Sequence, residues 1–362
     1  MADKAAARST AARLYAAFLA HGAAPVEADI LQPAETLLDL YGEDIRARAY
    51  VAADPLRGEM MLRPDFTVPV VQMHMAHGAE PARYAYMGEV FRKQDHLSDR
   101  KSEYLQVGYE VFARDNPSAA DAEVFALFAG LLSPLGLRAA TGDIGILMAA
   151  VRGLKTLDSR KTALLRHIWR PRRFTELLER FGGRVPVPES RLALLDMLAS
   201  GRPPAAGPLV GLRTEAEIAH RIAALQADAA APVIAGEEVA LLEDLLNLSA
   251  KSPGALARLR DLARAMPAIA PAADRMEARL DALAARGIDV AALDFEASHG
   301  RSTLEYYDGF VFSFHAADPA LPAVASGGRY DALTAVLGQG RSIPAVGGVV
   351  RPGLVADLEA NA

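Results

Sequence analysis

Apolar and polar residues follow different patterns along the chain and divide it into three stretches. Between about residues 5 and 155, alternating segments typical of strands mix with segments of helical spacing. The expected helices are 5–21, 34–41, 68–77 and 118–132, and the expected strands are 48–52, 60–62, 83–91 and 104–112. The segment 137–147 should return to the sheet and then become helical. Strands 83–91 and 104–112 flank a charged loop, which predicts an antiparallel hairpin.

The middle stretch, about residues 155–285, is rich in Ala, Leu, Arg and Glu. Proline and glycine residues interrupt it at intervals, which predicts a string of helices. After Gly287, strand patterns return at 290–295, 306–315 and 323–326, and a final helix closes the chain. Because the strands do not alternate regularly with helices, a doubly wound parallel sheet is disfavoured. We expect a strand-rich core interrupted by a helical insertion.

Composition narrows the class of protein. Of the 362 residues, 51% are apolar and 23% are charged, which is enough apolar material for a packed core. The formal net charge of -6 disfavours a dedicated nucleic-acid binder, because phosphate contacts favour basic proteins. The absence of cysteine excludes disulfides, thiolate metal sites and cysteine nucleophiles. With no signal-peptide pattern and no uninterrupted apolar run of roughly 18 residues, we expect a cytoplasmic protein without a membrane span.

Two pairs of polar residues could form a binding face. Asp65 and Thr67 are two residues apart, so on a strand their side chains would share a face. Gln106 and Glu110 are four apart on the predicted strand 104–112 and share a face in the same way. Taken alone, Asp65 is equally compatible with a solvated ion pair at the end of a strand, and the pair Gln106 and Glu110 is more typical of the solvated side of a strand.

Two aromatic motifs follow the insertion. Tyr306 and Tyr307 are expected in a third strand, where they would alternate faces, so that one of them packs in the core. The segment 326–331 reads as a tight Gly-Gly turn that presents Arg329 and Tyr330. Neither motif is informative by itself. The interpretation rests on the order and spacing of these two motifs together with the two polar pairs above.

Together the motifs resemble class II aminoacyl-tRNA synthetases, in particular histidyl-tRNA synthetase and its paralogue, the regulatory subunit of ATP phosphoribosyltransferase. Residues 62–67 are similar to the family's Leu-Arg-Pro-Glu-x-Thr, 91–112 to its second motif, 304–307 to Leu-Asp-Tyr-Tyr and 327–331 to Gly-Gly-Arg-Tyr-Asp. The resemblance spans roughly 10–155 and 285–350. It implies an α+β fold with a mixed, mainly antiparallel sheet flanked by helices. The core would comprise 1–155 and 284–362, with a mainly helical insertion at 156–283.

The resemblance also implies a histidine pocket. Its expected residues are Asp65, Thr67, Gln106, Glu110, Tyr307 and Tyr330. Acceptors among them suit the ammonium group, and Glu110 can accept a hydrogen bond from an imidazole N–H. Arg92, Arg100 and Arg351 match the positions of ATP-binding arginines and would be vestiges of that site. No metal site and no cofactor are expected.

Departures from the family pattern decide the expected function. Ser302 stands where the synthetase has a catalytic arginine, and Arg301, one residue away, would point to the opposite face of a strand. Gln94 replaces an acid of the second motif. The third motif, 347–352, keeps Arg351 but lacks its glutamate and ends in proline. We also expect no anticodon-binding domain, because too few residues follow the core.

These departures imply a non-catalytic regulatory subunit that senses L-histidine. The expected partners are a short-form ATP phosphoribosyltransferase catalytic subunit and a second copy of the chain. Pro33 is similar to the proline of the family's first motif, through which class II cores form dimers. The second copy would pair through this first-motif segment, in which Ile30, Leu31 and Leu37 are neighbouring apolar residues. Two alternatives remain: a histidine-activating ligase without an anticodon-binding domain, and a tRNA-binding module. ATP–pyrophosphate exchange separates the first alternative from the regulatory subunit, and a tRNA shift assay tests the second.

Overall fold

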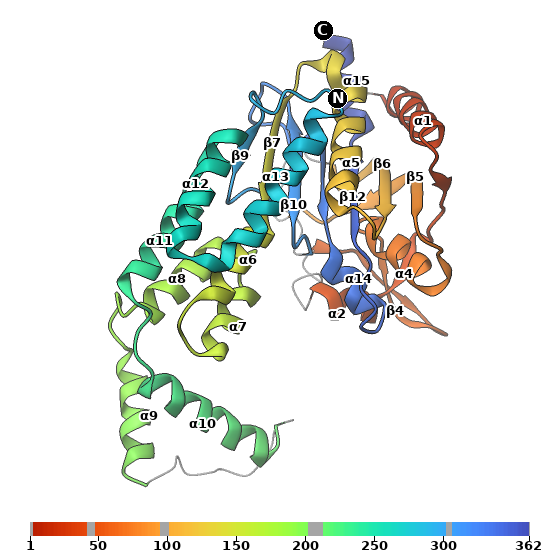
Figure 1. The fold of residues 1–362 in the computed structure, drawn as a ribbon. Helices are drawn as coiled ribbons and strands as arrows, with labels where there is room; N and C mark the ends of the chain where they lie inside the picture. The colour runs from red at the N-terminus through yellow and green to blue at the C-terminus, as the bar shows by residue number, and fades with distance from the viewer. Residues whose placement is uncertain (1–2, 42–47, 95–100, 202–212, 302–305, 362) are drawn as a thin grey trace.

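A long mixed sheet forms the centre of the molecule (Figure 1). The structure is a computed structural model, and it describes residues 3–41, 48–94, 101–201, 213–301 and 306–361. Within that part, the strands of the main sheet lie in the order β1-β5-β6-β12-β11-β10-β7-β9-β8. Neighbouring strands are antiparallel except for β1–β5 and β7–β9, which are parallel. A smaller sheet has the order β2-β4-β3. The expected α+β fold is confirmed.

The strands are β1 (Ala24–Pro25), β2 (Leu31–Pro33), β3 (Val51–Asp54), β4 (Gly58–Leu62), β5 (Ala82–Phe91), β6 (Glu103–Phe112), β7 (Arg138–Asp143), β8 (Ser249–Lys251), β9 (Asp294–Glu296), β10 (Phe310–His315), β11 (Ala325–Arg329) and β12 (Ala345–Val350). The helices are α1 (Lys4–Ala20), α2 (Ala34–Tyr41), α4 (Thr67–His77), α5 (Pro117–Leu132), α6 (Ile144–Gly153), α7 (Asp158–Arg166), α8 (Pro171–Phe181), α9 (Glu189–Ala199), α10 (Glu215–Ala230), α11 (Gly236–Leu246), α12 (Ser252–Ala265), α13 (Ala270–Ala284), α14 (Asp331–Leu337) and α15 (Pro352–Asn361). Two short 3-10 turns, η1 (Ser133–Leu135) and η2 (Pro267–Ile269), complete the described elements.

The hairpin of β5 and β6 forms as the alternating pattern predicted. Glu110 pairs with Tyr84 and Gln106 pairs with Gly88 across the two strands. Because side chains alternate between faces, Gln106 and Glu110 point to one side of the sheet and Tyr109 points to the other. The side that carries Gln106 and Glu110 is the front of the sheet, and the side that carries Tyr109 is the back.

Helices α1 and α5 cover the side of the sheet that carries Tyr109, and α5 lies on the viewer's side of the sheet in Figure 1. Phe18 of α1 lies 5.4 Å from the ring of Tyr109, and Phe125 of α5 lies 5.5 Å from the ring of Phe312. Among the described helices, α5 with η1 is long and apolar enough to cross a membrane by length and composition. It packs here as a core helix. Its N-cap is Asn116, whose side chain accepts from the Ala119 N–H.

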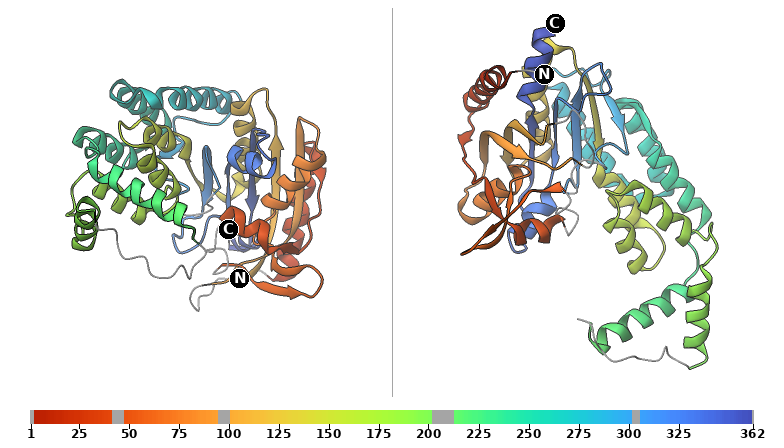
Figure 2. Two further views of the ribbon diagram at one scale, coloured as in Figure 1. Left: turned by 90° about the horizontal axis from the view of Figure 1, so that it is seen from below. Right: turned by 180° about the vertical axis from the view of Figure 1, so that it is seen from behind.

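The segment 156–283 is mostly helical, from α7 to α13. Its short strand β8 pairs with β9 at the edge of the main sheet, and α13 packs on α5. Helices α9 and α10 extend away from the rest of the molecule (Figure 2). Neither Glu189–Ala199 nor Glu215–Ala230 contains a buried residue. The two helices are joined to the body near their base, where Arg160 of α7 donates to Asp228 at 2.6 Å.

Two strand predictions and one turn prediction near the C-terminus need correction. Tyr306 and Tyr307 lie in a turn before β10, which begins at Phe310. The predicted strand 290–295 is reduced to β9, because a turn occupies residues before Asp294. The segment 326–331 is not a tight turn, since Gly327 and Gly328 lie within β11 and pair with β10 and β12. The sequence did not predict the central strand β11, because its two consecutive glycines interrupt the alternation of apolar and polar residues.

Candidate functional site

A nearly closed cavity lies on the front of the sheet. The space open to water-sized molecules is about 10 Å³, roughly what one water molecule needs. It is lined by Asp65, Thr67, Arg92, Gln106, Glu110, Tyr306, Tyr307, Tyr330, Gly347, Gly348 and Val349. These residues come from β6, β12, the position following the end of β5, the start of α4 and the segments before β10 and α14. The fold thus brings together all six residues predicted for the pocket.

Asp65 and Thr67 reach the cavity from a different element than expected. Strand β4 ends at Leu62, and Thr67 is the first residue of α4. The prediction that both residues share the face of a strand was therefore wrong. Asp65 Oδ1 accepts from the Val68 N–H at 3.4 Å, so the carboxylate lies at the positive end of the helix. Both side chains are buried.

Glu110 is the centre of the hydrogen bonds in the cavity. Its Oε1 accepts from Thr67 Oγ1 at 3.1 Å and from the Tyr86 hydroxyl at 2.9 Å, and its Oε2 accepts from the Tyr330 hydroxyl at 2.5 Å. Burial raises the pKa of Glu110 to about 7, although the three hydroxyl donors oppose that rise. The carboxyl group therefore changes charge near neutral pH.

Gln106 presents an unused acceptor. Its side chain is 1% exposed, and Oε1 is a buried atom with no hydrogen-bond partner among the described residues. A buried acceptor without a donor costs free energy, and a bound donor would remove that cost. Together with the Asp65 carboxylate, Gln106 makes one part of the cavity suited to an ammonium group.

The tyrosine pair before β10 behaves differently from its prediction. Tyr306 and Tyr307 both line the cavity, so neither is a pure packing residue. The Tyr306 hydroxyl donates to Thr67 Oγ1 at 3.3 Å, which in turn donates to Glu110. The indole N–H of Trp169, between α7 and α8, donates to the Tyr307 carbonyl at 3.1 Å. The helical segment therefore supports this wall of the cavity.

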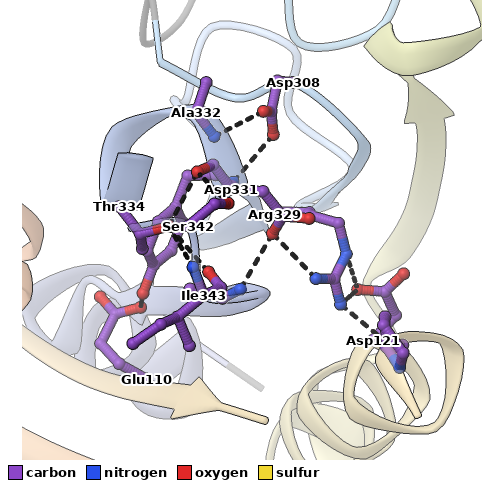
Figure 3. A network of polar contacts seen from close by, with 12 residues as sticks. Glu110, Asp121, Asp308, Arg329, Asp331, Ala332, Thr334, Ser342 and Ile343 are labelled. Carbon is purple, nitrogen blue, oxygen red and sulfur yellow. Dashed lines mark hydrogen bonds and ion pairs between the residues drawn. The ribbon is translucent and has the colours of Figure 1, made fainter. Parts of the chain in front are cut away.

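Polar contacts anchor Arg329 and Asp331, the two residues on either side of Tyr330 in the sequence (Figure 3). Arg329 donates to Asp121 Oδ1 from Nη2 at 2.7 Å and from Nε at 3.0 Å. Asp308 accepts from the backbone N–H groups of Asp331 and Ala332 at the start of α14. Burial, with the nearby charge of Asp331, raises the pKa of Asp308 to about 7. Asp121 also pairs with Arg279 of α13 at 3.4 Å, which links the helical layer to the wall that carries Tyr330.

Two of the three predicted vestiges of an ATP site, Arg92 and Arg351, lie in the described part of the chain. Arg92 lines the cavity, and its Nε donates to the Pro64 carbonyl at 2.8 Å. Arg351 donates to the Ala323 carbonyl, and its guanidinium lies 5.8 Å from the ring of Tyr104. Arg100 and Ser302 lie outside the described residues. In the described ranges, no cluster of three or more His, Asp or Glu side chains is arranged to hold a metal ion.

Arg301 does not lie on a strand, as its prediction assumed, but in a turn. Its Nε donates to the Ile168 carbonyl at 2.8 Å, and its guanidinium lies 4.9 Å from the ring of Phe174 in α8. The side chain is buried against the helical segment and is not among the residues that line the cavity. It connects the turn before Tyr306 with α8.

Three contributors to the site were missed by the sequence analysis: Tyr86, Tyr306 and Trp169. Tyr86 lies in a strand that reads as an ordinary apolar–polar alternation, so its role appears once the register with Glu110 is known. Tyr306 was not among the predicted pocket residues, because an assumed strand would have turned one of the two tyrosines into the core. Trp169 is the sole tryptophan of the sequence, and it lies far from the motifs along the chain.

Comparison with known proteins identifies the family of the chain. The family model described as histidyl-tRNA synthetase matches residues 2–227 and 214–352. An ATP phosphoribosyltransferase regulatory subunit from Brucella anthropi is 32% identical over 346 residues, which cover 89% of this chain and 89% of the relative. A second relative of the same name, from Brucella canis, is 32% identical over 347 residues, with 89% of each chain covered. The chain belongs to the ATP phosphoribosyltransferase regulatory subunit family.

Two solved structures share the fold of the chain. A Bacillus halodurans protein described as an ATP phosphoribosyltransferase regulatory subunit/histidyl-tRNA synthetase superposes with a TM-score of 0.69 at 19% identity, covering 99% of this chain and 81% of that one. A histidine–tRNA ligase subunit from Alicyclobacillus acidocaldarius gives a TM-score of 0.60 at 21% identity, covering 100% and 96%. The class II synthetase-like fold expected for a regulatory subunit of this family is thereby confirmed.

Proposed function

We propose that this chain is a histidine-sensing, non-catalytic subunit that works with a short-form catalytic subunit of ATP phosphoribosyltransferase, at the first step of histidine biosynthesis. The observation that carries the proposal is the unpaired acceptor of buried Gln106 beside the buried carboxyl group of Glu110 in one cavity. Histidine offers an ammonium group to Gln106 and Asp65 and a ring N–H to Glu110. These needs match the donors and acceptors of the cavity.

The departures from the synthetase pattern support a role without catalysis. Ser302 stands at the position of the arginine that would bridge the amino acid and the α-phosphate. Removing such a donor typically lowers a rate by about 10²–10³-fold. Arg351 donates to the Ala323 carbonyl, and α15 begins at the next residue, Pro352. The parts that would hold and activate ATP are therefore incomplete.

The closed cavity supports a role in signalling, because a ligand must displace side chains in order to enter. The walls that it would displace carry Tyr307 and Tyr330. The Tyr307 carbonyl accepts a hydrogen bond from Trp169 of the helical segment. Arg329, which precedes Tyr330, donates a hydrogen bond to Asp121 of α5. Binding would thus move elements far from the cavity. Feedback inhibition needs a coupling of about 1–3 kcal/mol between histidine and the catalytic subunit's substrates.

The first test measures histidine binding to the isolated chain by calorimetry, with Trp169 fluorescence as a second readout. Glu110→Gln and Glu110→Ala should weaken binding by roughly tenfold or more, because a ring N–H loses its charged acceptor. Glu176→Ala is the matched control, since Glu176 lies on α8 and is exposed. Equal affinity of the wild type and both Glu110 variants would exclude the cavity as the histidine site.

The second test adds the short-form catalytic subunit from the same organism. The two proteins should form a stable complex whose turnover differs from that of the catalytic subunit alone and is inhibited by histidine. Glu110→Gln should reduce that inhibition and leave the complex assembled. Inhibition equal to wild type would mean that histidine acts elsewhere, and a failure to associate would refute the regulatory role. A gel-shift assay with tRNA should show no binding.

The first-motif segment is our proposed surface for pairing two copies. Ile30, Val51 and Leu56, around the small sheet β2-β4-β3, are exposed, with 46%, 43% and 95% of their surface accessible. Leu37, by contrast, is buried inside the chain and supports the fold. Light scattering at micromolar concentration should give the mass of a dimer, and Leu56→Glu should shift it toward the monomer. A wild-type monomer would contradict this part of the proposal.

A further inference from the structure

Tyr86 contacts Glu110 on the same face of the sheet as the cavity, because its cross-strand partner Gly108 is two residues from Glu110. Tyr86 is fully buried on β5, and its hydroxyl donates to Glu110 Oε1 at 2.9 Å. Its ring stacks on Phe66, with 4.4 Å between the ring centroids and an angle of 12° between the planes. Tyr86 is not among the residues that line the cavity. It therefore acts on the carboxyl group and does not contact a ligand directly.

The hydrogen bonds to Glu110 are unequally divided. A carboxylate oxygen has two lone pairs, so the group has about four acceptor positions. Thr67 and Tyr86 use both positions of Oε1, whereas Tyr330 uses one position of Oε2. Among the described donors, this leaves one acceptor position, on Oε2, for a ligand.

Two glycines make room for Tyr86. A Cβ atom at Gly108, the cross-strand partner of Tyr86, would overlap the tyrosine ring and its hydroxyl. A Cβ atom at Gly88 would overlap Phe66, on which the ring stacks, and Arg63. The two glycines thus open a slot along the hairpin in which the aromatic rings lie flat. The slot fixes the ring, and the ring fixes the direction of the hydroxyl toward Glu110.

We infer that Tyr86 is a positioning residue that, together with Thr67, saturates Oε1 of Glu110 and leaves Oε2 as the acceptor that selects the ligand. One remaining position suits a group with one N–H at that point, such as an imidazole ring. A primary amide would bring a second N–H into the same space, and a buried donor without an acceptor is unfavourable. This inference rests on the proposed function and names the feature that would distinguish histidine from glutamine or asparagine.

The variant Tyr86→Phe tests the inference, because it removes the hydroxyl and keeps the stacked ring. Losing a donor to the carboxylate should move the titration of Glu110 in the ligand-free chain to higher pH. Infrared difference spectra can follow that titration, with Glu110→Gln to identify the carboxyl band. Asp65 is the other carboxylate that acts on Glu110 and is unchanged in the variant. Histidine should bind roughly threefold to tenfold more weakly.

Tyr84→Phe is the matched control. Tyr84 lies two residues away on β5 and is the direct cross-strand partner of Glu110, but its hydroxyl bonds to His74 Nδ1 at 3.0 Å. It should leave the Glu110 titration and histidine affinity unchanged. A titration that is the same in Tyr86→Phe as in wild type would overturn the inference, as would an equal shift in both variants. If the wild-type chain binds no histidine, the proposed function fails, and the ligand-free titration still decides whether Tyr86 positions Glu110.

Discussion

The carboxylate of Glu110 occupies the space in which a side chain at residue 347 would have to lie. Gly347 of β12 is the cross-strand partner of Glu110, and a Cβ atom built on it would overlap Oε2. Glu110 can therefore lie flat on the sheet and reach Tyr330 because its neighbour has no side chain. A glycine from the damaged third motif is thus still needed by the cavity.

Replacing that glycine should disrupt the cavity. In Gly347→Ala, the new methyl group would force the Glu110 carboxylate away from its three hydroxyl donors. We expect a loss of about 1–3 kcal/mol in the free energy of unfolding, the usual cost of overpacking, and a marked loss of histidine binding. Urea denaturation and calorimetry measure the two effects. Gly130→Ala is the control, because no atom lies within 4 Å of a Cβ at that position in α5; a comparable loss there would argue against the steric explanation.

Glu110 should make the stability of the chain depend on pH. Its pKa is raised from 4.5 to about 7 in the folded state, so folding favours the protonated form. This contribution is fully present below about pH 4.5 and is lost as the pH rises toward 7. At roughly 1.4 kcal/mol per pH unit, the change is on the order of 3 kcal/mol. In Glu110→Gln, the free energy of unfolding should change less with pH over this range. Urea denaturation measured at about one-unit steps from roughly pH 4 to pH 8 would show the difference.

The pKa of Asp308 is shifted in the same direction as that of Glu110. Comparing the wild type with Glu110→Gln separates the contributions of the two groups to the pH dependence of stability. The pKa of Asp308 is also raised to about 7, so stability contributed by Asp308 likewise falls with rising pH. Because Glu110→Gln leaves Asp308 in place, the difference between the wild-type and variant curves reports Glu110. A variant curve parallel to that of the wild type would show that Glu110 does not titrate in this range.

Asp121 should be one of the most sensitive positions for stability. It is buried and pairs with Arg329 at 2.7 Å and with Arg279 at 3.4 Å. Asp121→Ala leaves two buried guanidinium groups with fewer acceptors, and breaking such a pair typically costs about 3–5 kcal/mol. Asp261→Ala, which removes an exposed pair with Arg264, should cost less than about 1 kcal/mol. Equal midpoints of urea denaturation for the two variants would contradict the role of Asp121.

The chain should not activate histidine. Ser302 replaces the bridging arginine, and the third motif lacks its glutamate. No histidine-dependent ATP–pyrophosphate exchange should be detectable in the purified protein. Ser302→Arg should not restore exchange, because the third motif remains defective. Exchange at the rate of an ordinary synthetase would support the ligase alternative and overturn the non-catalytic role.

The sequence predicted those parts of the site that depend on local patterns. Gln106 and Glu110 share a face because a strand alternates, and the pattern of β6 is strong enough to show this. Gly327 and Gly328 were misjudged as a turn, since the reason for them is not local. A Cβ at Gly327 would meet Phe312, and one at Gly328 would meet Tyr307. Such requirements come from strands far apart in the sequence, as does the register that brings Tyr86 to Glu110.

Helices α9 and α10 bury no residue within their described ranges, and this has a consequence for how the chain opens. A helix without tertiary packing keeps little more than its own marginal stability. Backbone amides of these two helices should therefore exchange hydrogen for deuterium long before those of the β5–β6 hairpin, through local opening that leaves the sheet intact. The boundary between fast and slow exchange should fall at Asp228, where α10 is bonded to Arg160. The part of the chain that unfolds as one cooperative unit would then reach as far as the pair of Arg160 and Asp228. The two helices lie outside that unit, so a protease should cut there first.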